Sequence, residues 1–453
     1  MCTKYDGDPC RRRRYTACRA TLQKRPAYLG GVFVKSIVDG SVSLAPLPEC
    51  ERHSDCSVLF RPGYNGTAIV QRSIELDEPV IYVALNYRLS VFGFLGGKEV
   101  QEAGVGNLGL QDQRAALRWV NKYISAFGGD PFKVTIWGES AGATSVFLQL
   151  FANNGDNEGL FRAAIMNSGF AVPTGDIGEI QGTYDSVVDQ VGCSNATDTL
   201  GCLRLVQADD LLATANNFPT FTDFAGLVSP MLPRADGLFL TVPPYQLTSQ
   251  GKIADVPFIV GDVKDEGTIF SFGSLNLTTD EEVASYISEL WFPGSSPADL
   301  SALLGLYSSD PAAGSPFDTG SANAFSPQYK RIAALTGDWF FNAPRRRLLD
   351  RVSANKTVYN FLSARANFAG VGYPHTSDLL NAFGPGDMTD YFIRFVNDLD
   401  PNDASGVYWP PYNTSARLTL QFNDGSLPLN VTADDERLAG TEELSSLIGR
   451  FPL

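Results

Sequence analysis

Hydrophobic positions along this chain follow the periods of helices and strands in turn. Between Leu110 and Ala126, the apolar side chains of Leu110, Leu117, Val120 and Ile124 recur at helical spacing and share one face. That spacing predicts an amphipathic helix with this face turned toward a core.

Short apolar runs typical of buried strands are separated by longer helical stretches. The strand-like runs are residues 133–137, 255–261 and 357–362, and helix-like runs cover residues 144–150 and 332–350. Strands that alternate with helices predict an α/β fold in which helices cover both faces of a mostly parallel, twisted sheet. We find no internal repeat, and no apolar run is long enough to span a bilayer.

Composition agrees with a large soluble enzyme. With 44% hydrophobic and 19% charged residues, 453 positions can fill one large α/β core. A net charge of −15 argues against a nucleic-acid partner, because neutralising phosphates requires a basic footprint. We expect the basic run Arg11–Arg14 to be a disordered tail, and Arg345–Arg347 to form the solvated face of a helix.

The pentapeptide Gly138–Gly142 is the first candidate for chemistry. It has the form Gly-x-Ser-x-Gly and lies between the strand-like run and the following helix-like run. A nucleophile on such a sharp strand-to-helix turn needs small neighbours two residues away on each side, which the two glycines supply. Ser140 is therefore the predicted nucleophile, and the amide of Ala141 is aimed toward a developing oxyanion.

A serine nucleophile needs a base, and the chain contains only two histidines, His53 and His375. When the order along the chain is serine, acid and histidine, only His375 lies on the correct side of Ser140. It falls in a glycine-rich segment after a strand-like run, as expected for a loop on a rigid scaffold. The acid should follow another core strand, where Asp265 and Glu266 are adjacent and composition does not choose between them.

Four further runs carry a family resemblance. They are Asn107–Gln113, Ala115–Val120, Phe127–Pro131 and Val134–Gly142. Together they resemble the signature of the type-B carboxylesterases, an α/β-hydrolase family, and are most similar to its fungal extracellular lipases and esterases. Asp265–Thr268 resembles the acid motif of that family and His375–Asp378 its histidine motif. The resemblance covers about residues 64 to 453.

The resemblance implies a role for each candidate. Ser140 is the nucleophile, Glu266 the acid, His375 the base, and Ala141 one oxyanion donor. No metal or organic cofactor is implied, because one serine-histidine-acid set suffices and two histidines cannot form a histidine-rich metal site.

One part of the family pattern is missing. The family has a glycine-rich turn after a buried strand, whose amides complete the oxyanion hole, but no Gly-Gly pair occurs between Ser54–Phe60 and Arg61–Thr67. The pair Gly30-Gly31 lies before Cys56 and cannot be mapped onto this turn. We therefore expect a block to be absent between Phe60 and Arg61, as from a skipped exon or a faulty gene model. The strand beside the nucleophile strand would then be shortened or missing, and the glycine turn absent with it.

The extent of the family resemblance divides the chain into two segments. Residues 1–55 are an atypical basic segment that resembles the family poorly, and residues 56–453 form a single hydrolase domain. The first ten residues lack the apolar core of a signal peptide. We nevertheless expect a secreted protein whose true N-terminus differs from this one.

Cysteines and glycosylation motifs support an extracellular location. The family has a disulfide at the place of Cys193 and Cys202, and a partner for Cys56 could be either Cys18 or Cys50. Asn-x-Ser/Thr motifs predict a glycoprotein. They begin at Asn65, Asn195, Asn276, Asn355, Asn413 and Asn430.

Two functional classes remain. The first is hydrolysis of carboxylic esters, of lipids or other apolar acyl groups, through an acyl-enzyme. Contact with a lipid interface is a further expectation for such an enzyme, without any integral membrane segment. The alternative is a catalytically impaired or inactive homologue that lacks the oxyanion turn, or a non-catalytic binding member of the superfamily.

Overall fold

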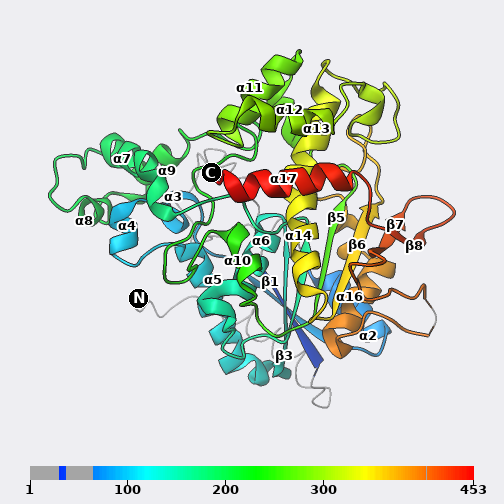
Figure 1. Ribbon diagram of the computed structural model, residues 1–453. Coiled ribbons are helices and arrows are strands. Elements are labelled where there is room, and N and C mark those ends of the chain that lie inside the picture. Colours follow the sequence, from blue (N-terminus) through cyan, green and yellow to red (C-terminus); the bar gives the residue numbers. More distant parts are fainter. Residues whose placement is uncertain (1–29, 37–64, 405) are drawn as a thin grey trace, which may run out of the picture.

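A single eight-stranded sheet organises the chain in the computed structural model, which describes residues 30–36, 65–404 and 406–453 (Figure 1). Its order is β2-β1-β3-β4-β5-β6-β7-β8, and every neighbouring pair is parallel except the antiparallel pair β7 and β8. The strands are β1 (Gly30–Ser36), β2 (Val80–Leu85), β3 (Gly129–Glu139), β4 (Ala163–Asn167), β5 (Phe258–Val263), β6 (Val358–Ala364), β7 (Leu418–Asn423) and β8 (Leu429–Ala433). The predicted mostly parallel α/β fold is confirmed.

Helices fill the connections between these strands. In chain order they are α2 (Thr67–Glu75), α3 (Ser90–Gly93), α4 (Lys98–Glu102), α5 (Leu108–Tyr123), α6 (Ala141–Gly155), α7 (Gln181–Gln190), α8 (Thr199–Leu203), α9 (Ala208–Ala215), α10 (Pro244–Gln250), α11 (Asp280–Leu290), α12 (Pro297–Gly305), α13 (Tyr329–Gly337), α14 (Ala343–Val352), α15 (Leu379–Ala382), α16 (Asp387–Asp398) and α17 (Leu438–Arg450). Three further turns matter below: the 3₁₀ segments η2 (Ile124–Phe127) and η4 (Ile269–Ser274), and the π-helical segment η6 (Asp338–Asn342).

Alternating side chains of the central strands enter two different cores. On β3, Ile136 packs in the core formed with α5, α6, α10, α14 and α17, whereas its neighbour Trp137 packs in the core formed with α2 and α16. On β5, Val260 and Ile259 divide in the same way. Because both faces are covered by helices (Figure 1), these strands read in the sequence as continuous apolar runs.

The amphipathic helix predicted over residues 110–126 is confirmed by α5 and η2. Its four apolar residues, Leu110, Leu117, Val120 and Ile124, are all buried in the larger core. The helix tightens into a 3₁₀ turn from Ile124, so the α-helical part ends three residues earlier than the pattern suggests.

The expectation of a shortened or missing strand beside β3 is wrong. Seven residues, Gly30–Ser36, form β1 and pair in parallel with both β2 and β3, with Val32 opposite Ile81 on one side and Val134 on the other. This strand comes from the segment that we expected to lie outside the family-like part of the chain. Strand pairing is carried by main-chain hydrogen bonds, so a short run of β-branched and aromatic residues can take this place. The expected loss of the glycine turn concerns residues 37–64, which lie outside the described residues.

The basic run Arg345–Arg347 is not a solvated face. Arg345 is buried on α14 and donates from Nε to Asp262 Oδ2 at 2.7 Å, and from Nη1 to Asn360 Oδ1 at 2.6 Å and Asp434 Oδ2 at 2.8 Å. Arg346 is also buried and donates to Asp434 Oδ1 at 2.7 Å. A guanidinium has several donors in a fixed plane, so one arginine can join three strands or loops that helical periodicity alone cannot anticipate.

These contacts perturb the buried charges in opposite directions. Burial raises the pKa of Asp262 to about 7, although the Arg345 charge opposes that rise. Burial would also raise the pKa of Asp434, but Arg345 and Arg346 together hold it below the ordinary value. Burial would lower the pKa of Arg345, whereas the two carboxylates raise it, so its charge persists throughout the working pH range.

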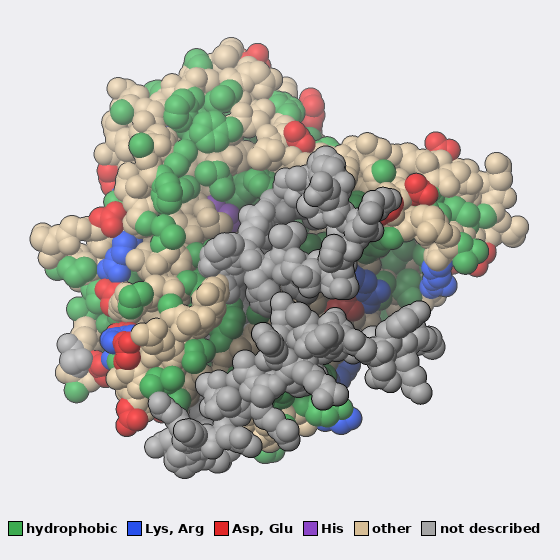
Figure 2. All heavy atoms as spheres, turned by 180° about the vertical axis from the view of Figure 1, so that it is seen from behind, with side chains coloured by type: hydrophobic (Ala, Val, Ile, Leu, Met, Phe, Trp, Pro, Cys, Tyr) green, Lys and Arg blue, Asp and Glu red, His purple; other side chains and the backbone are tan. Residues whose placement is uncertain are grey.

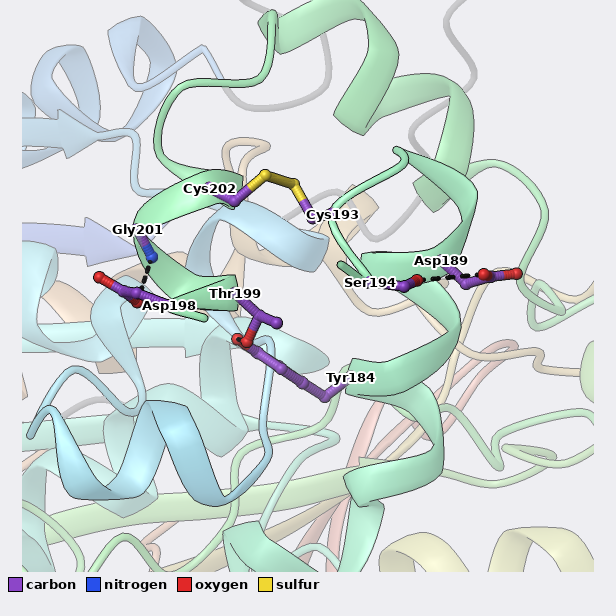
Figure 3. Close-up of a disulfide and its surroundings, with 8 residues drawn as sticks. All are labelled: Tyr184, Asp189, Cys193, Ser194, Asp198, Thr199, Gly201 and Cys202. Atoms are coloured by element: carbon purple, nitrogen blue, oxygen red, sulfur yellow. Dashed lines mark hydrogen bonds between the residues drawn. A yellow bond between two sulfur atoms is a disulfide. The ribbon is translucent and has the colours of Figure 1, made fainter. Parts of the chain in front are cut away.

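A separate lobe of α3, α4, α7, α8 and α9 lies at one side of the molecule (Figure 1). Its own small core includes Val100, Tyr184, Val187 and Leu203. Within it, Cys193 and Cys202 form a disulfide with Cα atoms 5.8 Å apart, as the resemblance implies (Figure 3). The proposed partners of Cys56 lie outside the described residues, and no helix among the described residues is long and apolar enough to cross a membrane.

We predict that Arg345→Met lowers the free energy of unfolding by about 3–5 kcal/mol, because it strands two buried carboxylates. Urea unfolding followed by circular dichroism measures the loss. The control Arg351→Ala, at an exposed position near the end of the same helix, should change stability by less than about 0.5 kcal/mol. A loss below about 1 kcal/mol for Arg345→Met would contradict the structural importance of this cluster.

Candidate active site

Ser140 sits alone between β3 and α6 in a strained backbone conformation. Its φ of 57° and ψ of −126° are rare for a residue with a side chain. Its N–H donates to Asn167 O at 2.9 Å, and its carbonyl accepts from Thr144 N–H at 2.9 Å. The first bond ties the turn to β4 and the second starts α6, so the surrounding structure holds the strained residue in place.

Two glycines are required by the tightness of this turn. A Cβ on Gly138 would lie 2.1 Å from Gly142 O, and one on Gly169 would lie 2.2 Å from Ser140 O. Both obstacles are main-chain atoms that cannot move aside. The glycine before the nucleophile, expected from the motif, is therefore explained by close approach of strand and helix, and Gly169 is a second close approach that the sequence did not indicate.

The structure brings Ser140, His375 and Glu266 together. His375 lies on the loop after β6, and its Nε2 is 2.7 Å from Ser140 Oγ. Its Nδ1 is 2.6 Å from Glu266 Oε2. Glu266, on the loop after β5, also accepts a hydrogen bond at Oε1 from Val263 N–H at 2.8 Å, which holds the second oxygen of the carboxylate in place. Serine, imidazole and carboxylate thus form one continuous chain of hydrogen bonds.

The neighbouring carboxylates Asp265 and Glu266 point in different directions. Asp265 is buried as well, yet it accepts hydrogen bonds from Ser315 and from Tyr373 N–H and makes none with His375. The choice that composition left open is therefore made by geometry, and only Glu266 meets the imidazole.

Three carboxylates act on the buried imidazole. Burial alone would lower the pKa of His375, but Glu266, through its charge and hydrogen bond, and then Glu139 and Asp378 raise it to about 9. Glu139 Oε1 lies 3.5 Å from His375 Nε2. Asp378 is held by Asn167 Nδ2 at 2.7 Å. The site thus favours a positive imidazolium whenever a proton reaches His375.

Aromatic rings pack against the imidazole. The ring centroids of Phe270, on η4, and Phe341, on η6, are 5.1 Å and 4.9 Å from that of His375. Phe221 packs edge-on against Phe270 at 5.9 Å. Figure 2 shows that green hydrophobic side chains gather on the upper part of the face of the molecule seen there. Sequence analysis did not single out these rings, because nothing distinguishes them among 29 phenylalanines.

Ala141 begins α6, where main-chain N–H groups have no helical carbonyl to receive them. Its amide follows Ser140 directly and lies at the positive end of the helix dipole, where an oxyanion would be stabilised. Among the described residues, no group of three or more His, Cys, Asp or Glu side chains could hold a metal ion.

This chain is similar in sequence and in fold to known proteins. The model of a carboxylesterase family matches residues 58–438. Lipase 4 of Diutina rugosa is 43% identical over 404 residues, covering 86% of this chain and 72% of the lipase. Secreted lipase 1 of Botryotinia fuckeliana is 42% identical over 375 residues, or 78% of this chain and 65% of the lipase. The crystal structure of Aspergillus niger EstA superposes with a TM-score of 0.76 at 28% identity, covering 94% of this chain and 82% of EstA.

The raised pKa of His375 predicts a pH-dependent contribution to stability. Because the folded pKa of about 9 exceeds the ordinary value of 6.5, the folded state holds the proton more tightly. That stabilisation is fully present below pH 6.5 and is lost as pH rises through about 9, with an upper limit on the order of 3 kcal/mol. Urea unfolding of the wild type and His375→Gln across this range should show a stability difference that shrinks with pH. A difference independent of pH would contradict the assignment.

Proposed function

The chain belongs to the carboxylesterase family of α/β-hydrolases and hydrolyses carboxylic esters, and we propose that Ser140, His375 and Glu266 carry out this reaction. The observation that supports these roles is the continuous hydrogen-bonded chain from Ser140 Oγ through both imidazole nitrogens to Glu266. The relatives named lipases, from Diutina rugosa and other fungi, support the same chemistry.

Each step moves one proton through His375. In the molecules whose imidazole is neutral, Ser140 Oγ attacks the ester carbonyl while its proton passes to Nε2, and Glu266 stabilises the imidazolium that forms. The tetrahedral intermediate carries its negative charge toward the amide of Ala141. Nε2 then returns the proton to the leaving alcohol, which leaves an acyl group on Ser140. Water then attacks the acyl carbonyl while one of its protons passes to Nε2. The acyl–oxygen bond breaks as Nε2 returns that proton to Ser140 Oγ, which releases the carboxylic acid.

We propose that the substrate is an ester with an apolar acyl chain. Phe270 and Phe341 lie against the imidazole, and Phe221 continues this aromatic wall away from it. Such a wall excludes water and favours an alkyl chain over a polar one. A half-exposed aromatic cluster of Phe272 and Phe325 near the same wall supports contact with a lipid interface.

We further propose that the protein is secreted and glycosylated, in a single hydrolase domain over residues 56–453 to which β1 adds a strand. Named secreted lipases among the relatives support secretion. Five of the asparagines in glycosylation motifs are exposed, namely Asn65, Asn195, Asn276, Asn355 and Asn413. Asn430 is the exception, since it lies half-buried on β8 and accepts a hydrogen bond from Asn423.

The impaired or binding homologue is the less favoured reading. It rests on the glycine turn, which belongs to the part of the chain outside the described residues. A chain that kept the three converging side chains only for binding would have no need of the strained turn at Ser140. Turnover by the purified wild type distinguishes the two readings.

We predict hydrolysis of p-nitrophenyl esters, with kcat/KM rising from short to long acyl chains because of the aromatic wall. Ser140→Ala and His375→Gln should each lower kcat roughly 10⁵–10⁶-fold, and Glu266→Gln roughly 10⁴-fold, since the acid acts through the imidazole. Ser308→Ala, at an exposed serine far along the chain, is the control and should retain wild-type kcat.

A fluorophosphonate probe gives a second measurement of the same proposal. It should label one serine per chain, and tryptic mass spectrometry should place the label on Ser140. Absence of turnover on every ester by a folded wild type would favour the impaired homologue, and labelling at another serine would refute the nucleophile assignment.

A further inference from the structure

Asp265 precedes Glu266, yet its carboxylate belongs to a different set of contacts. It is 1% exposed. Its Oδ1 accepts from Ser315 Oγ at 2.8 Å and from Phe317 N–H at 2.8 Å, and its Oδ2 accepts from Tyr373 N–H at 3.0 Å. Among the described residues, no lysine or arginine forms an ion pair with it. A buried carboxylate that accepts hydrogen bonds from three neutral donors holds those donors at fixed positions relative to one another.

The main chain of Asp265 meets the same partner. Its own N–H donates to Tyr373 O at 3.0 Å, so the two residues exchange hydrogen bonds in both directions. A β-bridge between Asp265 and Pro374 extends this contact by one residue. Tyr373 lies two positions before His375, and Asp265 lies one before Glu266. The loop that carries the acid and the loop that carries the base are therefore joined directly beside both residues.

The opposite loop is shaped to receive this carboxylate. Gly372 has a φ of +70°, and a Cβ there would lie 2.3 Å from Asp265 Oδ2 and 2.8 Å from Pro316 Cβ. The loop can pass this close only because residue 372 has no side chain. Thr268 Oγ1 adds a weaker second tie between the loops, to Val371 O at 3.1 Å.

We propose that Asp265 is a positioning residue that sets the place of His375 between Glu266 and Ser140. The inference rests on the proposed function for the roles of these three residues. The hydrogen bonds on either side of the imidazole, 2.6 Å and 2.7 Å long, leave little room for a displaced ring. A misplacement of about 1 Å at a reacting group can lower the rate about 100-fold. Loss of the link between the two loops could therefore lower the rate by up to this factor.

The test replaces the carboxylate by a side chain of the same shape. In Asp265→Asn the amide group can keep one acceptor oxygen but must present its NH₂ to either Tyr373 N–H or Ser315 and Phe317, where two donors then face each other. We expect kcat to fall about 10- to 100-fold with KM within about 3-fold, since the aromatic wall of Phe270, Phe341 and Phe221 is left unchanged. Asp434→Asn, a buried carboxylate in the Arg345 cluster, is the stability control and should lose at least as much melting temperature while keeping kcat within about 2-fold.

A second readout needs no substrate. The Nδ1 proton of His375, shared with Glu266, should give a low-field proton NMR resonance, and His53→Gln leaves His375 as the single histidine. We expect Asp265→Asn to shift or broaden this resonance, which Asp434→Asn should leave in place. If the wild type hydrolyses no ester, the proposed function fails, whereas the resonance still reports whether Asp265 positions the ring.

Glycine variants approach the same contact from the other loop, should Asp265→Asn not fold. Gly372→Ala pushes a methyl group against Asp265 Oδ2, whereas Gly370→Ala pays a similar backbone strain at φ +90° and meets only Phe325, at 3.4 Å. We expect Gly372→Ala to lower kcat and move the resonance well beyond the effect of Gly370→Ala. Equal effects of the two glycine variants, or wild-type kcat and an unmoved resonance in Asp265→Asn, would overturn the proposal.

Discussion

Parallel pairing of β3, β4, β5 and β6 brings the carboxyl ends of these strands to one edge of the sheet. Ser140 follows β3 directly, and Glu266 and His375 lie on the loops after β5 and β6, although Ser140 and His375 are 235 positions apart in the chain. Antiparallel pairing at any of these positions would carry one member to the opposite edge. The direction of the strands therefore decides whether a catalytic set exists at all, and the loops adjust only the final distances.

Strand β5 connects two buried clusters of charged side chains that differ in their balance of charge. Asp262 lies within the strand, where Arg345 ties it to β6 and to Asp434 behind the sheet. Four residues later, Glu266 holds the imidazole at the sheet's edge. The first cluster balances buried carboxylates with guanidinium groups and serves stability. The second leaves carboxylates in excess around one imidazole, which stabilises the imidazolium that ester cleavage creates.

Strand β1 shows what a sheet requires of its members. The place beside β3 is taken by Gly30–Ser36, a run that precedes the residues 58–438 matched by the family model. Main-chain hydrogen bonds accept any extended segment, whereas a loop that must present amides to an oxyanion demands a specific backbone path. A strand position is thus less demanding of the sequence than a loop that must present amides to an oxyanion.

The fold class and the three candidate residues could be predicted from the amino-acid sequence. Strand and helix periods are local properties of the sequence. The run Gly138–Gly142 predicts a sharp turn, because only glycine at position 138 tolerates the close approach of strand and helix. The sequence also indicated His375 as the base, because the other histidine, His53, precedes Ser140 in the chain. The family resemblance, not the spacing, selected Glu266.

Tertiary structure alone decided what depends on contacts between distant segments. It gave Asp265 partners on neighbouring loops, buried Arg345 among carboxylates from β5 and beyond β8, and placed Phe270 and Phe341 on the imidazole. The direction in which a side chain points, and the charge or ring that it meets, are set by packing between elements far apart in the chain. No local pattern encodes them.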